Sequence, residues 1–224
     1  MCYDTAFWQW ICADPEFVEC DGWLKGAYLV PVNESWVLVL KVPGFGAPTA
    51  VMTLEELAAF RINKFVNIGT AGGLQQNMDI GDIVLCDRAI RDEGTSNHYL
   101  PVEKYAFACP DLTESLCTAF EKKGIEYSKG TSWTTDAPYR ETIGELRQYR
   151  SDGVATVEME ISGLFAAGAY RGVGVSAILV ISDILSEEDW HQEYHSVEKL
   201  EGLKKTFEVI LEMMAMNSKN NQIN

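Results

Sequence analysis

The chain has 224 residues, of which 47% are hydrophobic and 23% are charged, a balance typical of one globular α/β domain that needs no metal or disulfide staples. Its formal net charge of -15 is spread along the chain and repels nucleic-acid backbones and anionic membranes, which argues against DNA or RNA binding. An anionic substrate would therefore need a local positive pocket.

The remaining composition points to a cytoplasmic protein. The six cysteines form no CxxC pair, and the first ten residues have neither the basic region nor the apolar core of a signal peptide. Three histidines argue against a zinc site, and no apolar run reaches the ~18 residues of a membrane span. We therefore expect reduced thiols, no metal and no membrane partner.

The first third of the chain predicts a hairpin and a helix. Lys25 to Val30 and Ser35 to Val42 read as strands joined by the turn Pro31-Val32-Asn33-Glu34. After the breaker cluster Pro43 to Pro48, Thr49 is expected to cap a helix that runs to Phe60.

Strands and helices alternate over the rest of the chain. In chain order we expect strands at Lys64–Ile68 and Asp82–Asp87, helices at Leu112–Lys123, Tyr139–Tyr149 and Glu160–Tyr170, a strand at Val173–Ile181 and a helix at Ser196–Met216. This alternation predicts a single α/β domain over residues 1–216, a three-layer α/β/α sandwich around a mixed central sheet, with a frayed polar tail at 217–224.

The first segment with chemical potential is Gly69-Thr70-Ala71-Gly72-Gly73, which follows a buried strand. Glycines let the backbone approach a ligand closely, and exposed N–H groups beside the Thr70 hydroxyl would form an anion-binding nest. The alternative is an ordinary tight turn after a strand.

The second segment is Val157-Glu158-Met159-Glu160, at the junction of a short strand and an apolar helix. A carboxylate can accept hydrogen bonds from both hydroxyls of a ribose diol, and a methionine offers a soft wall for a sugar or base. The alternative is that Glu160 is an acidic residue in a first helical turn, where the helix dipole favours it.

The third segment is Ser182-Asp183, after a strand that reads as buried on both faces. A buried aspartate is costly unless it is paired or used, and burial would raise its pKa toward that of a general acid. The alternative is a turn or helix-capping aspartate.

Taken in order, these segments resemble the nucleoside phosphorylase-I family, which includes purine nucleoside phosphorylases, uridine phosphorylases and methylthioadenosine nucleosidases. The resemblance extends from about Gly44 to the final helix, and further matching segments are Gly81–Val84, Arg91–Tyr99 and Thr134–Tyr139. It implies cleavage of the base–sugar bond of a nucleoside, with inorganic phosphate as co-substrate and no other cofactor.

The resemblance also implies a role for each matching residue. Asp183 would be catalytic and protonate the base, and Glu158, Met159 and Glu160 would bind the ribose. The phosphate, or a water in its place, would meet the turn of Gly44 and Gly46 together with Thr70, Ala71 and Gly72. Pro138, Tyr139 and Arg140 would line the base pocket, and His98 is either a site residue or a structural one.

The sequence departs from the family on the phosphate side. No Gly-Asp-Pro turn precedes Lys25, no arginine precedes Arg61, and Asn67 stands where the family has another arginine. Each lost charge-assisted contact is worth about 1.5–3 kcal/mol. Lys25 and Lys41 are the candidate replacements.

Three functions therefore stay open. The first is an atypical phosphorylase with a preference for purines, since uridine phosphorylases generally lack the aspartate at 183. The second is a nucleosidase that uses water, and the third is a non-catalytic nucleoside-binding protein on the same fold. The family also implies a homo-oligomer, a dimer or a trimer of dimers, and the aromatic residues Phe7, Trp8, Trp10 and Phe17 lie either at such an interface or on their own domain.

Overall fold

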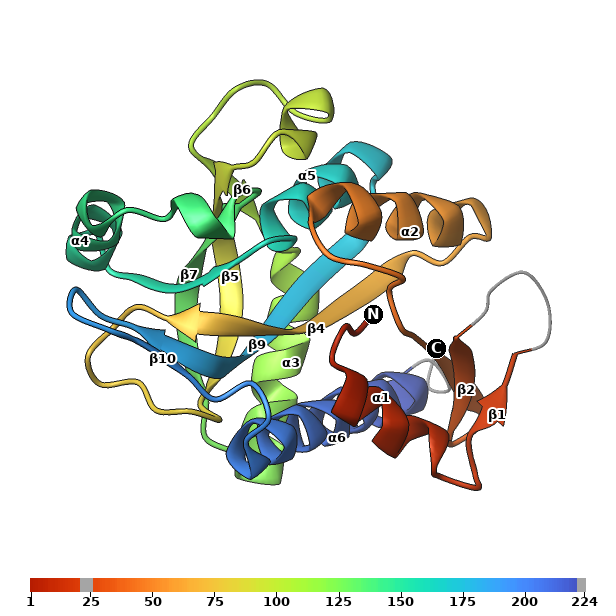
Figure 1. The fold of residues 1–224 in the computed structure, drawn as a ribbon. Coiled ribbons are helices and arrows are strands. Elements are labelled where there is room, and N and C mark those ends of the chain that lie inside the picture. Colours follow the sequence, from red (N-terminus) through yellow and green to blue (C-terminus); the bar gives the residue numbers. More distant parts are fainter. Residues whose placement is uncertain (21–25, 221–224) are drawn as a thin grey trace.

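The computed structural model describes residues 1–20 and 26–220 (Figure 1). The helices of this part are α1 Thr5–Cys12, α2 Ala47–Ala59, α3 Pro110–Lys123, α4 Ile143–Ser151, α5 Ile161–Arg171 and α6 Val197–Asn220, with short 3-10 turns at Thr95–His98 and Pro138–Arg140. The strands are β1 Val18–Glu19, β2 Ala27–Val32, β3 Ser35–Leu40, β4 Lys64–Gly73, β5 Ile83–Asp92, β6 Tyr105–Phe107, β7 Ser128–Thr135, β8 Val154–Glu158, β9 Gly174–Leu185 and β10 Trp190–Gln192.

A mixed sheet in the order β10-β9-β4-β8-β7-β5-β6 forms the centre of the molecule. Helices α2 and α5 cover one face of it, and α1, α3 and α6 lie on the other (Figure 1). The predicted α/β fold with a mixed central sheet is thus confirmed. The sequence pattern did not predict that β5 also pairs with β9, so that β9, β4, β8, β7 and β5 close into a ring.

The N-terminal region builds a small second sheet and a helix that packs on α6. Strands β2 and β3 form the predicted antiparallel hairpin, with a turn at Asn33, where φ is +53°, and Glu34. The sequence did not predict α1. The rings of Phe7, Trp10 and Phe17 each lie about 6 Å from that of Phe207, at 5.9, 5.9 and 6.1 Å between centroids. These aromatic residues therefore pack on their own domain.

Three predicted helix boundaries are wrong for local reasons. Helix α2 begins at Ala47, before Thr49, because Pro48 fits the first turn of a helix and Gly46 precedes it. Helix α4 begins at Ile143, where Thr142 and Glu145 form a reciprocal capping box. Helix α6 continues through Asn220, so the first four residues of the predicted tail are helical, and residues 221–224 lie outside the described part.

Strands β4 and β9 run further than predicted, and this extension builds the site. The parallel pairing of β4 with β9 places Gly72 opposite Asp183, and the short antiparallel pairing of β4 with β8 places Gly72 opposite Val157. A bulge between Ala71 and Gly72 shifts the register at this point. The three segments singled out in the sequence therefore meet at one place in the sheet.

Candidate active site

A cavity of about 580 Å³ opens where β4, β8 and β9 lie side by side. Residues 3–6 form one wall. The others are formed by Pro138, Tyr139 and Glu141, and by Trp190, Tyr194, His195 and Lys199. The cavity has the size of small-molecule sites, which occupy roughly 300–1,000 Å³. Of the predicted site residues, it brings together Thr70, Ala71, Gly72, Pro138, Tyr139, Glu158, Met159, Glu160 and Asp183.

Asp183 is buried in the floor of the cavity, with 5% of its surface exposed. Its Oδ1 accepts a hydrogen bond from the Ser182 hydroxyl at 2.7 Å, and its Oδ2 accepts one from the Trp190 indole N–H at 2.7 Å. The Asp183 carboxylate is therefore buried but paired, as the cost of burying a charge requires. Because β9 continues to Leu185, Asp183 is a strand residue and not a turn or helix cap.

Of the two glutamates, Glu158 accepts more hydrogen bonds from the protein itself. Its Oε1 accepts from the hydroxyls of Ser132 and Thr134 at 3.2 and 2.5 Å. Its Oε2 accepts from the backbone N–H groups of Glu160 and Ile161, at 2.7 and 2.8 Å, and so caps α5. Burial and the neighbouring Glu160 nevertheless raise the pKa of Glu158 to about 8. We conclude that Glu158 organises the start of α5.

Glu160 keeps more of its hydrogen-bonding capacity for a ligand. Its Oε1 accepts from the Gly46 N–H at 2.7 Å, while its Oε2 accepts only a long 3.3 Å bond from the Met159 N–H. Glu160 is the residue that precedes α5, and its own side chain does not cap that helix. Burial raises its pKa. Between the two carboxylates, Glu160 has the geometry to accept a diol.

The glycine segment differs from its prediction. Residues 69–73 are not a free turn but the last half of β4, paired along their length with β9. On the β9 side their backbone therefore belongs to the sheet, while β8 pairs only with Gly72 and Gly73. Anion binding by Thr70, Ala71 and Gly72 stays a prediction. The glycines matter for space: a Cβ on Gly72 would lie 2.3 Å from Leu185 Cδ1 and 3.1 Å from Asp183 Oδ2.

Four predicted site residues do not line the cavity. Gly44 and Gly46 lie just outside it, and the Gly46 N–H serves Glu160 and not an anion. Arg140 and His98 are exposed and are not among the lining residues, although Arg140 lies in the chain between the lining residues Tyr139 and Glu141.

The wall opposite the base segment holds residues that the sequence did not single out. The Tyr3 hydroxyl donates to Asn67 Oδ1 at 3.0 Å, and burial with the nearby Glu160 and Glu158 raises the pKa of Tyr3, so the phenol keeps its proton. The uncharged Tyr3 phenol is therefore the hydrogen-bond partner of Asn67, the residue at which the resemblance led us to expect an arginine.

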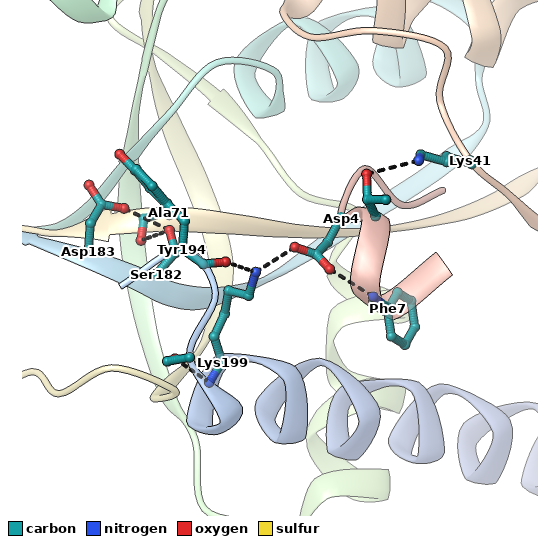
Figure 2. A network of polar contacts seen from close by, with 10 residues as sticks. Asp4, Phe7, Lys41, Ala71, Ser182, Asp183, Tyr194 and Lys199 are labelled. Atoms are coloured by element: carbon teal, nitrogen blue, oxygen red, sulfur yellow. Dashed lines mark hydrogen bonds and ion pairs between the residues drawn. The ribbon is translucent and has the colours of Figure 1, made fainter. Parts of the chain in front are cut away.

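Lys199 is the most buried cation at the cavity, with 3% of its surface exposed. Its Nζ forms an ion pair with Asp4 Oδ2 at 2.6 Å and also donates to the Tyr194 carbonyl, while Asp4 Oδ1 caps α1 through the Phe7 N–H (Figure 2). The ammonium group is therefore already neutralised. Lys41 bonds the Thr5 hydroxyl at 3.1 Å and does not line the cavity, and Lys25 lies outside the described residues.

The base wall contains a carboxyl group that the prediction missed. Glu141 lines the cavity beside Pro138 and Tyr139, and burial, with the neighbouring carboxylates of Asp183 and Glu145, raises its pKa to about 7. A second hollow of about 290 Å³, largely apolar, adjoins it and shares Glu141 and Trp190. The only feature of the sequence that could have indicated Glu141 as a lining residue is its position next to the predicted base segment.

The cavity is acidic as a whole. Five carboxyl groups line it, those of Asp4, Glu141, Glu158, Glu160 and Asp183, against the side chains of Lys199 and His195. In the described part of the chain, no group of three or more metal-ligating side chains is placed to hold a metal ion. No described helix is long and apolar enough to cross a membrane.

Several relatives of this chain are named nucleoside phosphorylases. The chain is 29% identical to the uridine phosphorylase of Haemophilus influenzae over 74% of its own length and 68% of that protein. It is 32% identical to the guanosine phosphorylase of Halorubrum lacusprofundi, covering 62% of this chain and 57% of the relative. A DeoD-type purine nucleoside phosphorylase of Bacillus cereus is 28% identical over 62% and 60% of the two chains.

The fold has a close counterpart among solved structures. The purine nucleoside phosphorylase of Toxoplasma gondii, solved in complex with immucillin-H, superposes with a TM-score of 0.84 at 22% identity, covering 98% of this chain and 90% of that one. The family model described as the phosphorylase superfamily matches residues 27–214. The chain therefore belongs to the phosphorylase superfamily.

Proposed function

We propose that this protein cleaves the N-glycosidic bond of a nucleoside by phosphorolysis, releasing the free base and ribose 1-phosphate. The observation that carries the proposal is the meeting of β4, β8 and β9, which puts Glu160 and Asp183 into one cavity of nucleoside size. Relatives named as uridine, guanosine and purine nucleoside phosphorylases support the reaction type.

The proposed reaction divides the cavity into three parts. Glu160 accepts the ribose 2'- and 3'-hydroxyls, and Pro138, Tyr139 and Glu141 face the base. A phosphate oxygen attacks C1' from the side of Thr70, Ala71 and Gly72, the C1'–N bond breaks, and its electron pair goes to the base. Asp183 enters this step in its protonated form and transfers its proton to a ring nitrogen of the base as the C1'–N bond breaks. Such a transfer contributes roughly 10²–10⁴-fold to the rate.

We favour a purine as the base, because a carboxyl group at Asp183 is suited to protonating a ring nitrogen. Glu141 adds a second carboxyl group on the same wall. An assembly of several copies and inorganic phosphate as the only co-substrate remain predictions from the family resemblance. A cytoplasmic location remains a prediction from the composition.

Hydrolysis is the second candidate, favoured by the charge of the cavity. The one buried ammonium group in the lining, that of Lys199, is already paired with Asp4, so the cavity offers a phosphate dianion little positive charge. Water is neutral and is not repelled. Release of base at the same rate with and without phosphate would establish hydrolysis.

The ribose contact is tested with Glu160→Gln. Because an amide offers one acceptor oxygen where the carboxylate offers two, kcat/KM for a ribonucleoside should fall about tenfold to a hundredfold, in line with hydrogen bonds to a charged group worth about 1.5–3 kcal/mol. The loss should be much smaller for the matching 2',3'-dideoxynucleoside, which lacks the diol. The exposed Glu103→Gln is the control. An equal loss for both substrates would show that Glu160 does not bind the sugar hydroxyls.

A further inference from the structure

Trp190 is joined to Asp183 by a short hydrogen bond, 2.7 Å from the indole Nε1 to Oδ2. Trp190 is the first residue of β10, which pairs antiparallel with β9 so that Trp190 lies opposite Leu185. The indole lines both the main cavity and the adjoining hollow. It therefore stands at the base end of the site.

Asp183 accepts two hydrogen bonds, and a ligand could replace one of the two donors more easily than the other. Ser182 is the neighbour of Asp183 in β9 and is buried, with 2% of its surface exposed. Trp190 comes from a three-residue strand at the edge of the sheet, all of whose residues are exposed, and 42% of its own surface is open. The Trp190 bond is thus the one that a ligand can replace.

The hairpin tip that carries Trp190 is held by few contacts with the rest of the molecule. Arg147 on α4 pairs with Glu187 at 2.6 Å, but both side chains are well exposed, and exposed ion pairs contribute only about 0–1 kcal/mol. Arg150 also donates to the carbonyl of Leu185, the residue opposite Trp190, at 2.7 Å, whereas the turn itself is held by local bonds between Ser186 and Asp189. A small free energy is therefore enough to move the tip.

We infer that Trp190 closes the base end of the cavity by bonding Asp183, and that a nucleoside base must displace the indole to reach this carboxylate. The inference rests on the proposed function, since it assumes that the base binds at Asp183. A ring nitrogen of the base accepts a hydrogen bond only from a protonated carboxyl group, whereas the indole N–H favours the ionised one. The base and the indole therefore compete for Asp183.

Trp190→Phe tests this competition, because it keeps an aromatic ring and removes the N–H. In this variant a base has no Trp190–Asp183 hydrogen bond to break. The dissociation constants of free adenine and hypoxanthine, measured by calorimetry, should therefore fall about tenfold, which corresponds to the weaker hydrogen bonds made to charged groups. The KM for the corresponding nucleosides should fall with them. Trp36→Phe is the matched control, because Trp36 is exposed on β3 and does not line the cavity.

Fluorescence gives a second readout that needs no turnover. Base binding should change tryptophan emission in the wild type and in Trp36→Phe, and this change should be lost in Trp190→Phe. Unaltered base affinity in Trp190→Phe, or a lower kcat at unchanged KM, would overturn the inference, the latter by showing that Trp190 orients Asp183. In either case turnover of nucleosides by the wild type would leave the proposed function standing, whereas its absence together with absent base binding would refute both.

Discussion

Glu158 and Glu160 are two residues apart, yet the backbone gives them different tasks. Glu158 ends β8 and points back to the first N–H groups of α5, where a carboxylate complements the positive end of the helix. Glu160 lies one step further, beyond the strand, and faces the cavity. The sequence motif offered both as ribose ligands, and only the hydrogen-bond partners separate them.

Glu141 makes the stability of the protein depend on pH. Its pKa is raised to about 7 in the folded protein, from an ordinary value of 4.5, so the folded state binds more protons than the unfolded one between these values. This contribution is complete below about pH 4.5 and is lost as the pH rises through about 7. Glu158, whose pKa is raised to about 8, acts in the same sense.

Glu141→Gln should remove the Glu141 part of this dependence. The midpoint of thermal unfolding of the variant, relative to the wild type, should rise between about pH 4.5 and 7 and then stay level. Glu103→Gln, at an exposed position, should show no such trend. A constant difference between Glu141→Gln and wild type across this range would contradict the assignment.

At the scale of elements, the site depends on close approach between three strands. Gly72 lies between Asp183 of β9 and Val157 of β8, and any side chain there meets Leu185, Val157 and the Asp183 carboxylate. Interiors of this density tolerate added atoms poorly.

Gly72→Ala should therefore destabilise the protein by about 1–3 kcal/mol, the usual cost of overpacking, and should also lower activity by shifting Asp183. Gly69→Ala on the same strand is the matched comparison, because its Cβ would come no nearer than 3.4 Å to Leu179. Denaturant unfolding and base release measure the two effects. Equal behaviour of both alanine variants would contradict the role given to Gly72.

Most helices and the most apolar strands were predicted, but their ends were not, and α1 and the strands β6, β7 and β10 were missed. Continuous apolar runs such as Val173 to Ile181 identify buried strands, but polar and glycine residues that continue a strand, as in Ser182-Asp183 and Gly69 to Gly73, look like its end. Their pairing depends on neighbours distant in sequence. The same limit explains why the β5–β9 pairing was missed.

Site residues that lie near the ends of apolar strands could be predicted from the sequence. Site residues that only tertiary contacts bring to the cavity could not. Asp183, Glu160 and Thr70 come directly after apolar runs, so their convergence could be expected. Tyr3, Asp4 and Lys199 come from opposite ends of the chain and meet only in the folded molecule, as Figure 2 shows for Asp4 and Lys199. Arg140 and His98 were expected from the family resemblance, but both are exposed and neither lines the cavity.

At the scale of the whole molecule, a net charge of -15 surrounds a cavity that is itself rich in carboxyl groups. Neutral nucleosides enter such a cavity without electrostatic penalty, whereas phosphate meets repulsion that falls as salt screens it. If phosphate is the nucleophile, its KM should therefore decrease as the concentration of an inert salt rises. An increase in that KM would contradict the electrostatic account.

The central claim is that this cavity breaks a nucleoside's glycosidic bond through Asp183. The most direct test measures base release from purine and pyrimidine nucleosides, with and without phosphate, in the wild type and in Asp183→Asn. We predict phosphate-dependent release, fastest for purine nucleosides, that falls about 10²–10⁴-fold in Asp183→Asn, the usual contribution of a general acid. Binding of nucleosides without release from any of them would contradict the claim and leave a nucleoside-binding protein on this fold.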